Sequence, residues 1–332
     1  MNMYDMIKGF PDQFSDQYNT LKDLNFNLDK FSNIDRIVIS GMGGSAISGD
    51  IVKLLLRDSI ENSLHVIRDY SCNSLYQSNA TLFIISSYSG NTEEALSMYE
   101  VAKGCSKKII CVTTGGKLKE LADRDGIETI LLNPISISEG FQPRAALGYS
   151  IMALLMILNK LNLASNSQIE MIVDSIPKLH SFYEDNCKKN QYAYKIAKDI
   201  YGGLIVIYGT LLTEPIVSRF RSQIAENAKL LASHHILPEL NHNEIEGFGS
   251  NPFPTIPRHV VWINDQDDHK QVVKRIRITS EILKDMGTKN IYININNSVR
   301  DNFVTRSLKL IYLTDWISYY LAEFNNVDPI PV

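Results

Sequence analysis

The most restrictive feature of the sequence is an alternation of short β-branched runs with helical segments, which occurs twice along the chain. In the first half, apolar runs predict strands at 34–40, 64–70, 80–90, 107–116 and 128–133. Helical segments lie between them, at about 47–56, 92–103 and 117–123. This alternation is typical of βαβ units, in which helices cover both faces of a parallel sheet. The sequence therefore predicts an α/β fold with a doubly wound parallel sheet.

The same pattern returns after residue 201. It predicts strands at 202–209, 259–265 and 290–296, and helices at about 215–233, 270–286 and 303–324. Aligning IDRIVISGMGGSA with GGLIVIYGTLLTE places strand on strand and turn on turn, which indicates two copies of one unit. Residues 145–201 show only helical periodicity. We expect a helical lead-in at 1–33, a first domain at 34–150, a helical connector at 151–200 and a second domain with a C-terminal helix at 201–332.

Composition and charge exclude several classes of protein. The chain has 332 residues, of which 44% are hydrophobic, and its 33 Lys+Arg against 37 Asp+Glu give a net charge of −4. The apolar fraction is sufficient for buried cores. Proteins that bind along nucleic acid need clustered Lys and Arg to displace counterions, which this near-neutral balance does not supply. We expect no nucleic-acid partner.

The cysteines and the apolar segments bear on the compartment. Four scattered cysteines, without a CxxC pair or a Cys/His cluster, argue against a disulfide framework or structural zinc and favour a reducing compartment. The segment MNMYDMIKGFPDQF lacks the apolar core of a signal peptide, and the longest apolar stretch, 149–158, is about half of the roughly 20 residues that a bilayer requires. The sequence predicts a soluble cytoplasmic protein with no membrane partner.

Two glycine- and serine-rich turns are the clearest chemical signals. In GMGGSA (41–46), between a strand and a helix, Gly43 and Gly44 let backbone amides face a ligand at the positive end of the helix, and Ser45 adds a hydroxyl. The same turn fits G-x-G-x-x-A, a loose dinucleotide-binding pattern, and also a plain turn without any ligand.

The second turn, SSYSGNTEE (86–94), places several hydroxyl groups at one strand-to-helix junction. Helix capping by Asn91 or Thr92 explains part of it, but leaves Ser87 and Ser89 without a role. Together the two turns predict a cup for a tetrahedral dianion. Its residues are Gly43, Gly44, Ser45, Ser87, Ser89 and Thr92. The second copy has Thr-Leu-Leu-Thr in place of the glycine turn, and these side chains would block an anion.

These two turns resemble those of the sugar isomerase (SIS) domain, a flavodoxin-like fold that binds phosphosugars. Further segments resemble the motifs of the bifunctional phosphoglucose/phosphomannose isomerases, in the same order and over nearly the whole chain. They are GFQPRAALGYS (140–150), AENAK (225–229), PELNHNEIEGF (238–248) and VDPIPV (327–332). The resemblance implies aldose–ketose isomerisation of glucose 6-phosphate and mannose 6-phosphate with fructose 6-phosphate, without a metal or any other cofactor.

The resemblance also implies roles for three residues. Glu226 matches the carboxylate that moves the proton between C1 and C2, although most helix glutamates are simply solvated. His242 would open the sugar ring by proton transfer, a task that suits a pKa near neutral. Arg144 would stabilise the enediolate, since a guanidinium stays charged and can reach two oxygens. In such relatives the histidine crosses a dimer interface, which implies a homodimer with His242 contributed across it.

The sequence departs from this family at two points. The family places a catalytic lysine shortly after DP-x-PV, whereas no lysine follows Asp328 here. The lysine lies beyond the printed residues, or another residue such as Lys309 replaces it, or ring opening is impaired. At Ile330 relatives often carry a threonine that is associated with accepting the C2 epimer. Because Ile330 is apolar, the sequence predicts the phosphoglucose activity more strongly than the phosphomannose activity.

Two rival functions stay open at this point. A phosphosugar sensor would use the same cup without catalysis, and the absent lysine fits it, but a sensor has no need for the three catalytic candidates. A nicotinamide-dependent oxidoreductase needs an acidic residue after the second strand, for which Asp69 is the candidate. His234 and His235, taken as neighbours on a helix, point about 100° apart and are poor partners for one metal ion.

Overall fold

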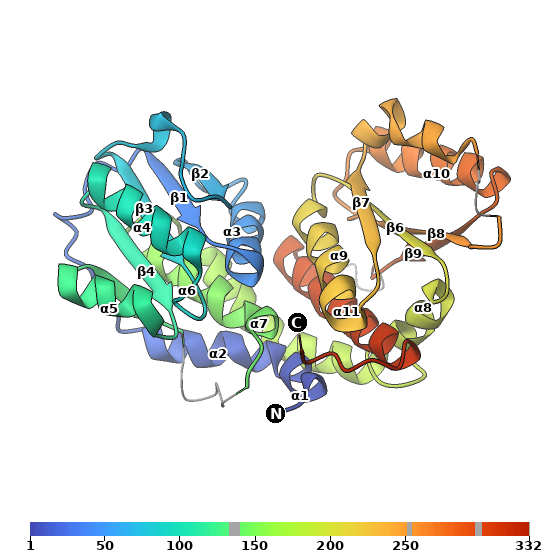
Figure 1. Cartoon of the computed structure of the whole chain (residues 1–332), viewed down its shortest axis with the longest axis horizontal. Helices are drawn as coiled ribbons and strands as arrows, with labels where there is room; N and C mark the ends of the chain where they lie inside the picture. Colours follow the sequence, from blue (N-terminus) through green and yellow to red (C-terminus); the bar gives the residue numbers. More distant parts are fainter. Residues whose placement is uncertain (133–139, 251–253, 296–300, 332) are drawn as a thin grey trace. The chain divides into compact units, whose positions relative to one another are not determined.

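The computed structural model describes residues 1–132, 140–250, 254–295 and 301–331. The chain divides into two compact units, Met1–Ile176 and Pro177–Val332 (Figure 1). Each unit is built on one parallel sheet with helices on both faces. The predicted fold class and the predicted duplication of the α/β unit are thereby confirmed.

The first unit contains a five-stranded sheet with the strand order β2-β1-β3-β4-β5. Its strands are β1 (Arg36–Ser40), β2 (Ser63–Ile67), β3 (Thr81–Ser86), β4 (Ile109–Thr113) and β5 (Glu128–Leu131). Its helices are α1 (Met3–Lys8), α2 (Phe10–Leu21), α3 (Gly43–Leu55), α4 (Glu93–Cys105), α5 (Gly116–Asp125) and α6 (Leu147–Lys160), with the short turns η1 (Ser74–Tyr76) and η2 (Pro143–Ala145). This order is that of flavodoxin-like sheets, whereas the dinucleotide-binding order places β1 between β2 and β4. The oxidoreductase alternative loses its structural basis.

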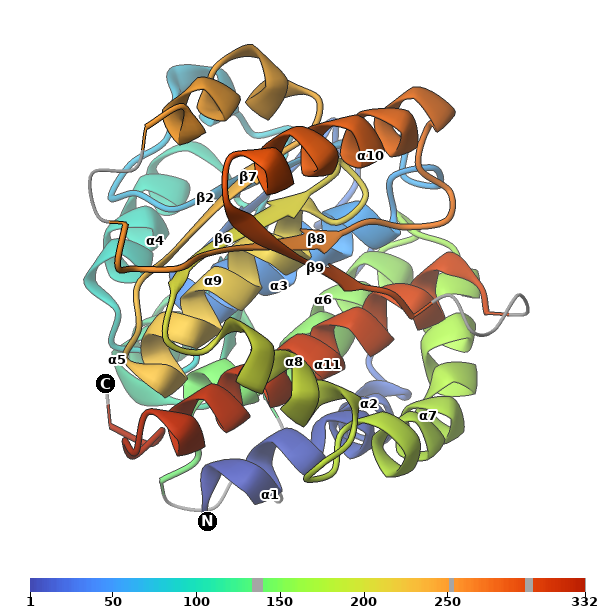
Figure 2. The same cartoon turned by 90° about the vertical axis from the view of Figure 1, so that its right-hand side faces the viewer.

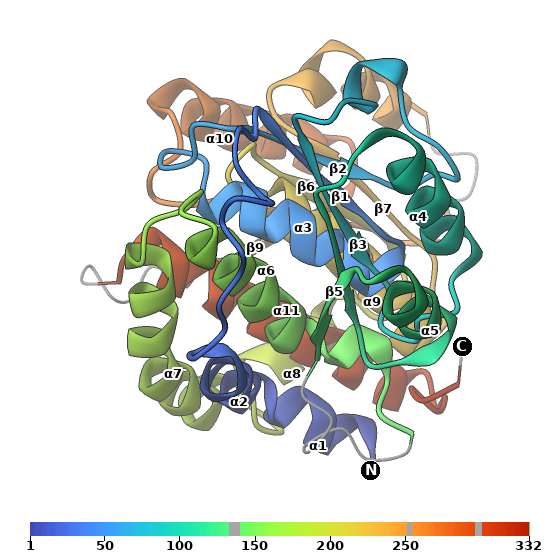
Figure 3. The same ribbon diagram turned by 90° about the vertical axis from the view of Figure 1, so that its left-hand side faces the viewer.

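Both faces of the first sheet are covered, which explains why its strands are continuous apolar runs. Every residue of β3 is buried. On one face Val38, Phe83 and Cys111 pack against α4 and α5 in a closed apolar cluster. Figure 3 shows α4 and α5 on that side of the sheet and α3 and α6 on the other, with α2 packed along α6. The lead-in helices therefore belong to the first unit.

The second unit contains a four-stranded sheet with the order β7-β6-β8-β9. Its strands are β6 (Leu204–Gly209), β7 (Ala232–Ile236), β8 (Arg258–Ile263) and β9 (Thr288–Ile293). Its helices are α8 (Tyr192–Ile200), α9 (Glu214–Ala228), α10 (Lys270–Asp285) and α11 (Phe303–Phe324), and two short turns are η3 (Glu239–His242) and η4 (Glu244–Phe248). Figure 2 shows α8, α9 and α11 on one side of this sheet and α10 on the other.

A long helix, α7 (Ser167–Asn186), passes from the first unit to the second, and the division between the units falls inside it at Pro177. The segment at 145–201 is helical as predicted, with α6, α7 and α8 in turn. The domain limits at residues 33, 150 and 200 stay predictions.

Two helix boundaries differ from the sequence-based expectation. The helix after β1 begins at Gly43, not near residue 47, so the glycine turn is itself the first turn of α3. The helix expected at 215–233 ends at Ala228, because Lys229 adopts a left-handed conformation with φ of 56°. The strand β7 follows, and it includes His234 and His235. Adjacent residues of a strand face opposite sides of the sheet, so the geometry assumed for this histidine pair was wrong.

Candidate functional site

The two serine- and glycine-rich loops meet at the carboxyl edge of the first sheet. They follow β1 and β3, which are hydrogen-bonded neighbours with Ser40 opposite Ile85. Strand order reverses between β1 and β3, which is where ligands bind in open α/β sheets. The Tyr88 N–H donates to Ser45 Oγ at 3.2 Å and joins one loop to the other. The structure thus brings the two halves of the predicted cup together.

The hydroxyl groups of the second loop lie close to one another. Ser87 Oγ and Thr92 Oγ1 are 2.9 Å apart, and the Gly90 N–H donates to Ser87 Oγ at 3.1 Å. Ser89 is exposed, and its Oγ accepts the N–H of Asn91 at 3.2 Å. Thr92 occupies the N-cap position of α4, yet its side chain makes no capping hydrogen bond. Capping therefore does not account for the Thr92 hydroxyl.

Both helices that leave these loops direct their amino ends toward the same edge. The first N–H groups of a helix lack partners within it, and at α3 these belong to Gly43 and Gly44. The start of α4 adds a second positive helix end. Glu93, in the first turn of α4, carries an opposing charge, but its carboxylate lies 3.4 Å from the hydroxyl of Tyr70. The structure therefore gathers backbone amides and hydroxyls at this edge, which are the groups that the predicted cup requires.

A third loop, which sequence reasoning missed, braces the second. Gly90 has φ of +70°, and a Cβ built there would lie 1.9 Å from the carbonyl oxygen of Gly115. The Tyr88 carbonyl accepts the Thr114 N–H at 3.0 Å, and Asn91 Oδ1 accepts the Lys117 N–H at 3.0 Å. The signal that could have found this loop is the glycine pair Gly115 and Gly116, which ends the fourth predicted strand.

Arg144 packs against the glycine turn. It lies in η2 and is 4% exposed, and its Nη1 donates to Gln142 Oε1 at 3.1 Å. A Cβ built on Gly44 would be 3.2 Å from the Pro143 carbonyl oxygen and 3.6 Å from the Arg144 Cα. The absence of a side chain at Gly44 lets η2 approach the first turn of α3. The structure therefore brings the predicted arginine to the predicted cup.

The lead-in helix α2 holds η2 in place through Gln13, another residue that sequence reasoning missed. Gln13 is buried, its Nε2 donates to the Ala145 carbonyl at 2.7 Å, and its Oε1 accepts the Gly148 N–H at 2.9 Å. No local pattern distinguishes Gln13 from the other polar residues of this helix, so the sequence offers no signal for its role.

Tyr88 adds a phenol behind the cup. Its hydroxyl is buried, and burial, with a smaller contribution from Tyr149, raises the pKa of Tyr88 well above its ordinary value. The phenol therefore stays protonated and neutral at physiological pH.

Glu226 lies near the end of α9 in the second unit and is half-buried. Lys229, which ends this helix, donates from its Nζ to the Glu226 carbonyl at 2.6 Å and to the Pro331 carbonyl. The VDPIPV motif thus returns to the part of α9 that carries Glu226. The Ile330 N–H donates to Asp328 Oδ1 at 2.8 Å within that motif.

His242 is exposed at the end of η3. The preceding Asn241 anchors the turn, since its Nδ2 donates to Thr279 Oγ1 at 2.8 Å. Because α9 leads into β7 and η3 follows it, Glu226 and His242 lie at opposite ends of this strand, whose five residues span about 16 Å. The structure does not bring these two residues of one chain together.

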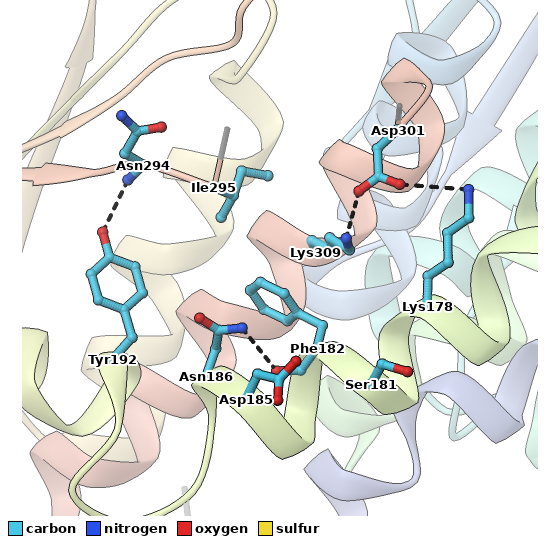
Figure 4. A pocket seen from close by; sticks show the side chains of 10 residues that line it. All are labelled: Lys178, Ser181, Phe182, Asp185, Asn186, Tyr192, Asn294, Ile295, Asp301 and Lys309. Carbon is cyan, nitrogen blue, oxygen red and sulfur yellow. Dashed lines mark hydrogen bonds and ion pairs between the residues drawn. The ribbon is translucent and has the colours of Figure 1, made fainter. Parts of the chain in front are cut away.

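Lys309, considered above as a replacement for the family's lysine, lies elsewhere. It pairs with Asp301 in a cavity of about 420 Å³, where Lys178 also approaches the Asp301 carboxylate at 3.5 Å (Figure 4). The part of α11 that lies near Glu226 is marked by Ser318, which is hydrogen-bonded to Asn227, the residue after Glu226. Ser318 lies nine positions after Lys309, which is about 13.5 Å along the helix. Lys229, not Lys309, supplies an ammonium group next to Glu226.

The equivalent edge of the second sheet is filled by its own side chains. Thr213, which aligns with Ser45, accepts the Thr210 N–H at 2.9 Å and donates to the Ile263 carbonyl at 3.0 Å. Asp265 follows β8 and forms a buried pair with Arg306, with two contacts of 2.8 Å. This edge therefore carries a threonine and a buried carboxylate–guanidinium pair where the first copy has its glycine turn, and the absence of a phosphate site here stays a prediction.

Metal and membrane sites were also sought. In the described ranges, no three His, Cys, Asp or Glu side chains are grouped so that they could hold a metal ion. No described helix is both long enough and apolar enough to cross a bilayer.

Comparison with known proteins identifies relatives over the full length. Residues 189–332 match the family model described as the bacterial phospho-glucose isomerase C-terminal SIS domain. The bifunctional phosphoglucose/phosphomannose isomerase of Caldicellulosiruptor bescii is 39% identical, with 99% of this chain and 96% of that protein covered. The protein of the same name from Aquifex aeolicus is 35% identical, with coverages of 99% and 95%.

Solved structures show the same fold at low sequence identity. The C-terminal domain of glucosamine-fructose-6-phosphate aminotransferase from Francisella tularensis has a TM-score of 0.73 at 15% identity and covers 98% of this chain and 96% of its own. Tagatose-6-phosphate ketose/aldose isomerase from Escherichia coli has a TM-score of 0.64 at 16% identity, with coverages of 99% and 95%. At these identities the likeness extends to the fold alone.

Proposed function

Because this chain belongs to the family of bifunctional phosphoglucose/phosphomannose isomerases, we propose that it interconverts glucose 6-phosphate and mannose 6-phosphate with fructose 6-phosphate. The observation that carries the proposal is the cup at the carboxyl edge of the first sheet. There two helix amino ends and the hydroxyls of Ser45, Ser87 and Thr92 gather beside the buried Arg144. Such a surface suits the 6-phosphate of a hexose.

The chemical steps are assigned to three side chains. Glu226 removes the proton from C2 of the open-chain aldose, which leaves a cis-enediolate, and then delivers a proton to C1. The ketose forms as the O2 hydroxyl gives up its proton and O1 gains one. Arg144 stabilises the negative charge that develops on the enediolate oxygens. His242 opens the sugar ring by proton transfer at the ring oxygen. These steps need no redox or metal cofactor.

The proposal includes a homodimer in which His242 acts on the substrate bound by the partner copy. Its exposure on η3, and its place at the opposite end of β7 from Glu226, support this arrangement. We also place the protein in the cytoplasm, which the four free thiols support. A non-catalytic sensor is not favoured, since the full-length relatives are enzymes.

A coupled assay tests the proposal. Purified protein is incubated with fructose 6-phosphate and a chelator, and glucose 6-phosphate and mannose 6-phosphate are measured separately. Formation of both is the expected result. Formation of glucose 6-phosphate alone would limit the activity to phosphoglucose isomerisation and would assign Ile330 a part in substrate specificity. Absence of both products, with the melting temperature still raised by phosphosugar, would contradict catalysis and favour a sensor.

A further inference from the structure

A row of polar side chains is buried between α9 and α11 in the second unit. Most of α11 is buried, and α9 packs along it. On the facing side of α9 lie Arg219, Gln223 and Asn227, each no more than 3% exposed. Their spacing of four residues places them on one face of the helix. The contact between these two helices is therefore polar where an apolar one would be ordinary.

Each polar side chain in the row has a partner on α11. Arg219 Nη2 donates to Asp315 Oδ2 at 2.8 Å, and Gln223 Nε2 donates to Asp315 Oδ1 at 3.0 Å. Asn227 Nδ2 donates to Ser318 Oγ at 2.9 Å. The Ala228 carbonyl, at the end of α9, accepts from Asn325 Nδ2 at 2.8 Å. We call these contacts the α9–α11 ladder.

The α9–α11 ladder fixes the position of α9 more than it stabilises the fold. A buried ion pair adds little net stability compared with well-packed apolar residues, because both charges lose their hydration. A displaced ladder is costly, however, since each buried donor or acceptor left without its partner bears the full penalty of losing its hydration. Only one rotation and one axial position of α9 satisfy all the rungs.

Glu226 depends directly on that rotation. It lies seven residues after Arg219, and seven steps of about 100° fall only some 20° short of two full turns, so it leaves α9 on nearly the same side. A side-chain tip lies about 5–6 Å from the helix axis, so a roll of 10° moves it by about 1 Å. A misplacement of about 1 Å can cost an enzyme about 100-fold in rate.

We propose that Arg219, Gln223 and Asn227, with Asp315 and Ser318, are positioning residues that hold the Glu226 carboxylate in the geometry for proton transfer. The inference rests on the proposed function, in which Glu226 is the base. None of the ladder residues needs to touch the sugar. Their effect passes through the placement of α9.

The test replaces one rung with an apolar side chain of similar shape. In Gln223→Met, Asp315 keeps its pair with Arg219, so the fold is retained. We expect kcat to fall about 10- to 100-fold. The KM stays within about twofold because the phosphate loops are untouched. The primary isotope effect on kcat with [2-²H]glucose 6-phosphate rises, since a misplaced base makes proton transfer limiting.

Two further variants separate positioning from general destabilisation. Gln223→Glu combined with Asp315→Asn exchanges donor and acceptor across the rung, and we expect it to recover most of the lost kcat. Asn290→Ala removes partly buried hydrogen bonds to Trp262 and to the Ser280 carbonyl in the same unit. It lowers the melting temperature while kcat and the isotope effect stay at the wild-type values.

The outcomes distinguish the inference from the proposed function. If the wild-type protein does not isomerise hexose 6-phosphates, the proposed function fails, and the inference fails with it. If the wild type is active and Gln223→Met keeps the wild-type kcat and isotope effect, the inference alone is overturned. It is also overturned if Asn290→Ala reproduces the effects of Gln223→Met.

Discussion

Replacing Thr92 with valine separates phosphate binding from helix capping. The substitution keeps the shape of the side chain and removes only the hydroxyl. In the structure this hydroxyl makes no capping bond to α4 and lies 2.9 Å from Ser87 Oγ. If it binds the substrate phosphate, its loss weakens every phosphosugar equally and leaves the chemical step alone.

The magnitude follows from the bonds that are lost. A hydrogen bond to a charged group contributes about 1.5–3 kcal/mol, which corresponds to about 10- to 150-fold in affinity. The free protein loses only the neutral bond to Ser87, about 0.5–1.5 kcal/mol, and Ser87 Oγ keeps the N–H of Gly90. We therefore expect Thr92→Val to raise KM by about 10- to 150-fold with kcat nearly unchanged.

The assay combines initial rates with calorimetric titration of fructose 6-phosphate. Thr20→Val is the matched control, because it also removes one threonine hydroxyl of the first unit, bonded there to the Asp16 carbonyl at 2.9 Å on α2. It should leave KM unchanged. A Thr92→Val protein with wild-type KM and affinity would refute the assignment of this hydroxyl to the phosphate.

Three other substitutions have equally direct readouts. Gly90→Ala places a Cβ 1.9 Å from the Gly115 carbonyl oxygen and requires an alanine in the left-handed conformation. The affinity for phosphate measured by titration should therefore fall more than 10-fold, and an unchanged affinity would contradict the loop geometry. Gly44→Ala puts a Cβ 3.2 Å from the Pro143 carbonyl oxygen and displaces η2, which carries Arg144, by a few tenths of an ångström. The kcat should therefore fall several-fold with a small change in melting temperature, whereas a wild-type kcat would argue against Arg144 as the enediolate stabiliser. Burial lowers the pKa of His234 below 6.5, so that below this pH the unfolded chain binds a proton that the folded chain does not, and stability falls as the pH decreases. The melting temperature of His234→Gln should therefore fall less between pH 7.5 and 5 than that of the wild type, and an equal fall would contradict this.

The sequence was sufficient for the parts of the fold that are set by local patterns. Strands buried on both faces are continuous apolar runs, which is why β1, β3 and β4 were predicted close to their observed positions. The two loops of the proposed cup could be located because their glycines and hydroxyls are grouped at strand-to-helix junctions, which is a local pattern. The start of α3 was misplaced because Gly43 and Gly44 are poor helix formers, and the tertiary contact with η2 overrides that propensity.

Other features depend on contacts that no local pattern reveals. The end of α9 was missed because a lysine, not a glycine, takes the left-handed position at residue 229, and β7 is an edge strand with polar residues. Gln13 and the α9–α11 ladder became visible only as buried polar side chains with partners far away in sequence. The approach of Arg144 to Gly44 likewise joins segments about 100 residues apart.

The central claim is that Glu226 moves a proton between C1 and C2 of a hexose 6-phosphate. The most direct measurement is isomerisation of fructose 6-phosphate in D₂O, followed by proton NMR, with the wild type and with Glu226→Gln. The expected result is deuterium at C2 of the glucose 6-phosphate formed by the wild type, and no product from Glu226→Gln although it still binds phosphosugar. Normal turnover by Glu226→Gln, with the same deuterium content at C2 as the wild-type product, would contradict the claim.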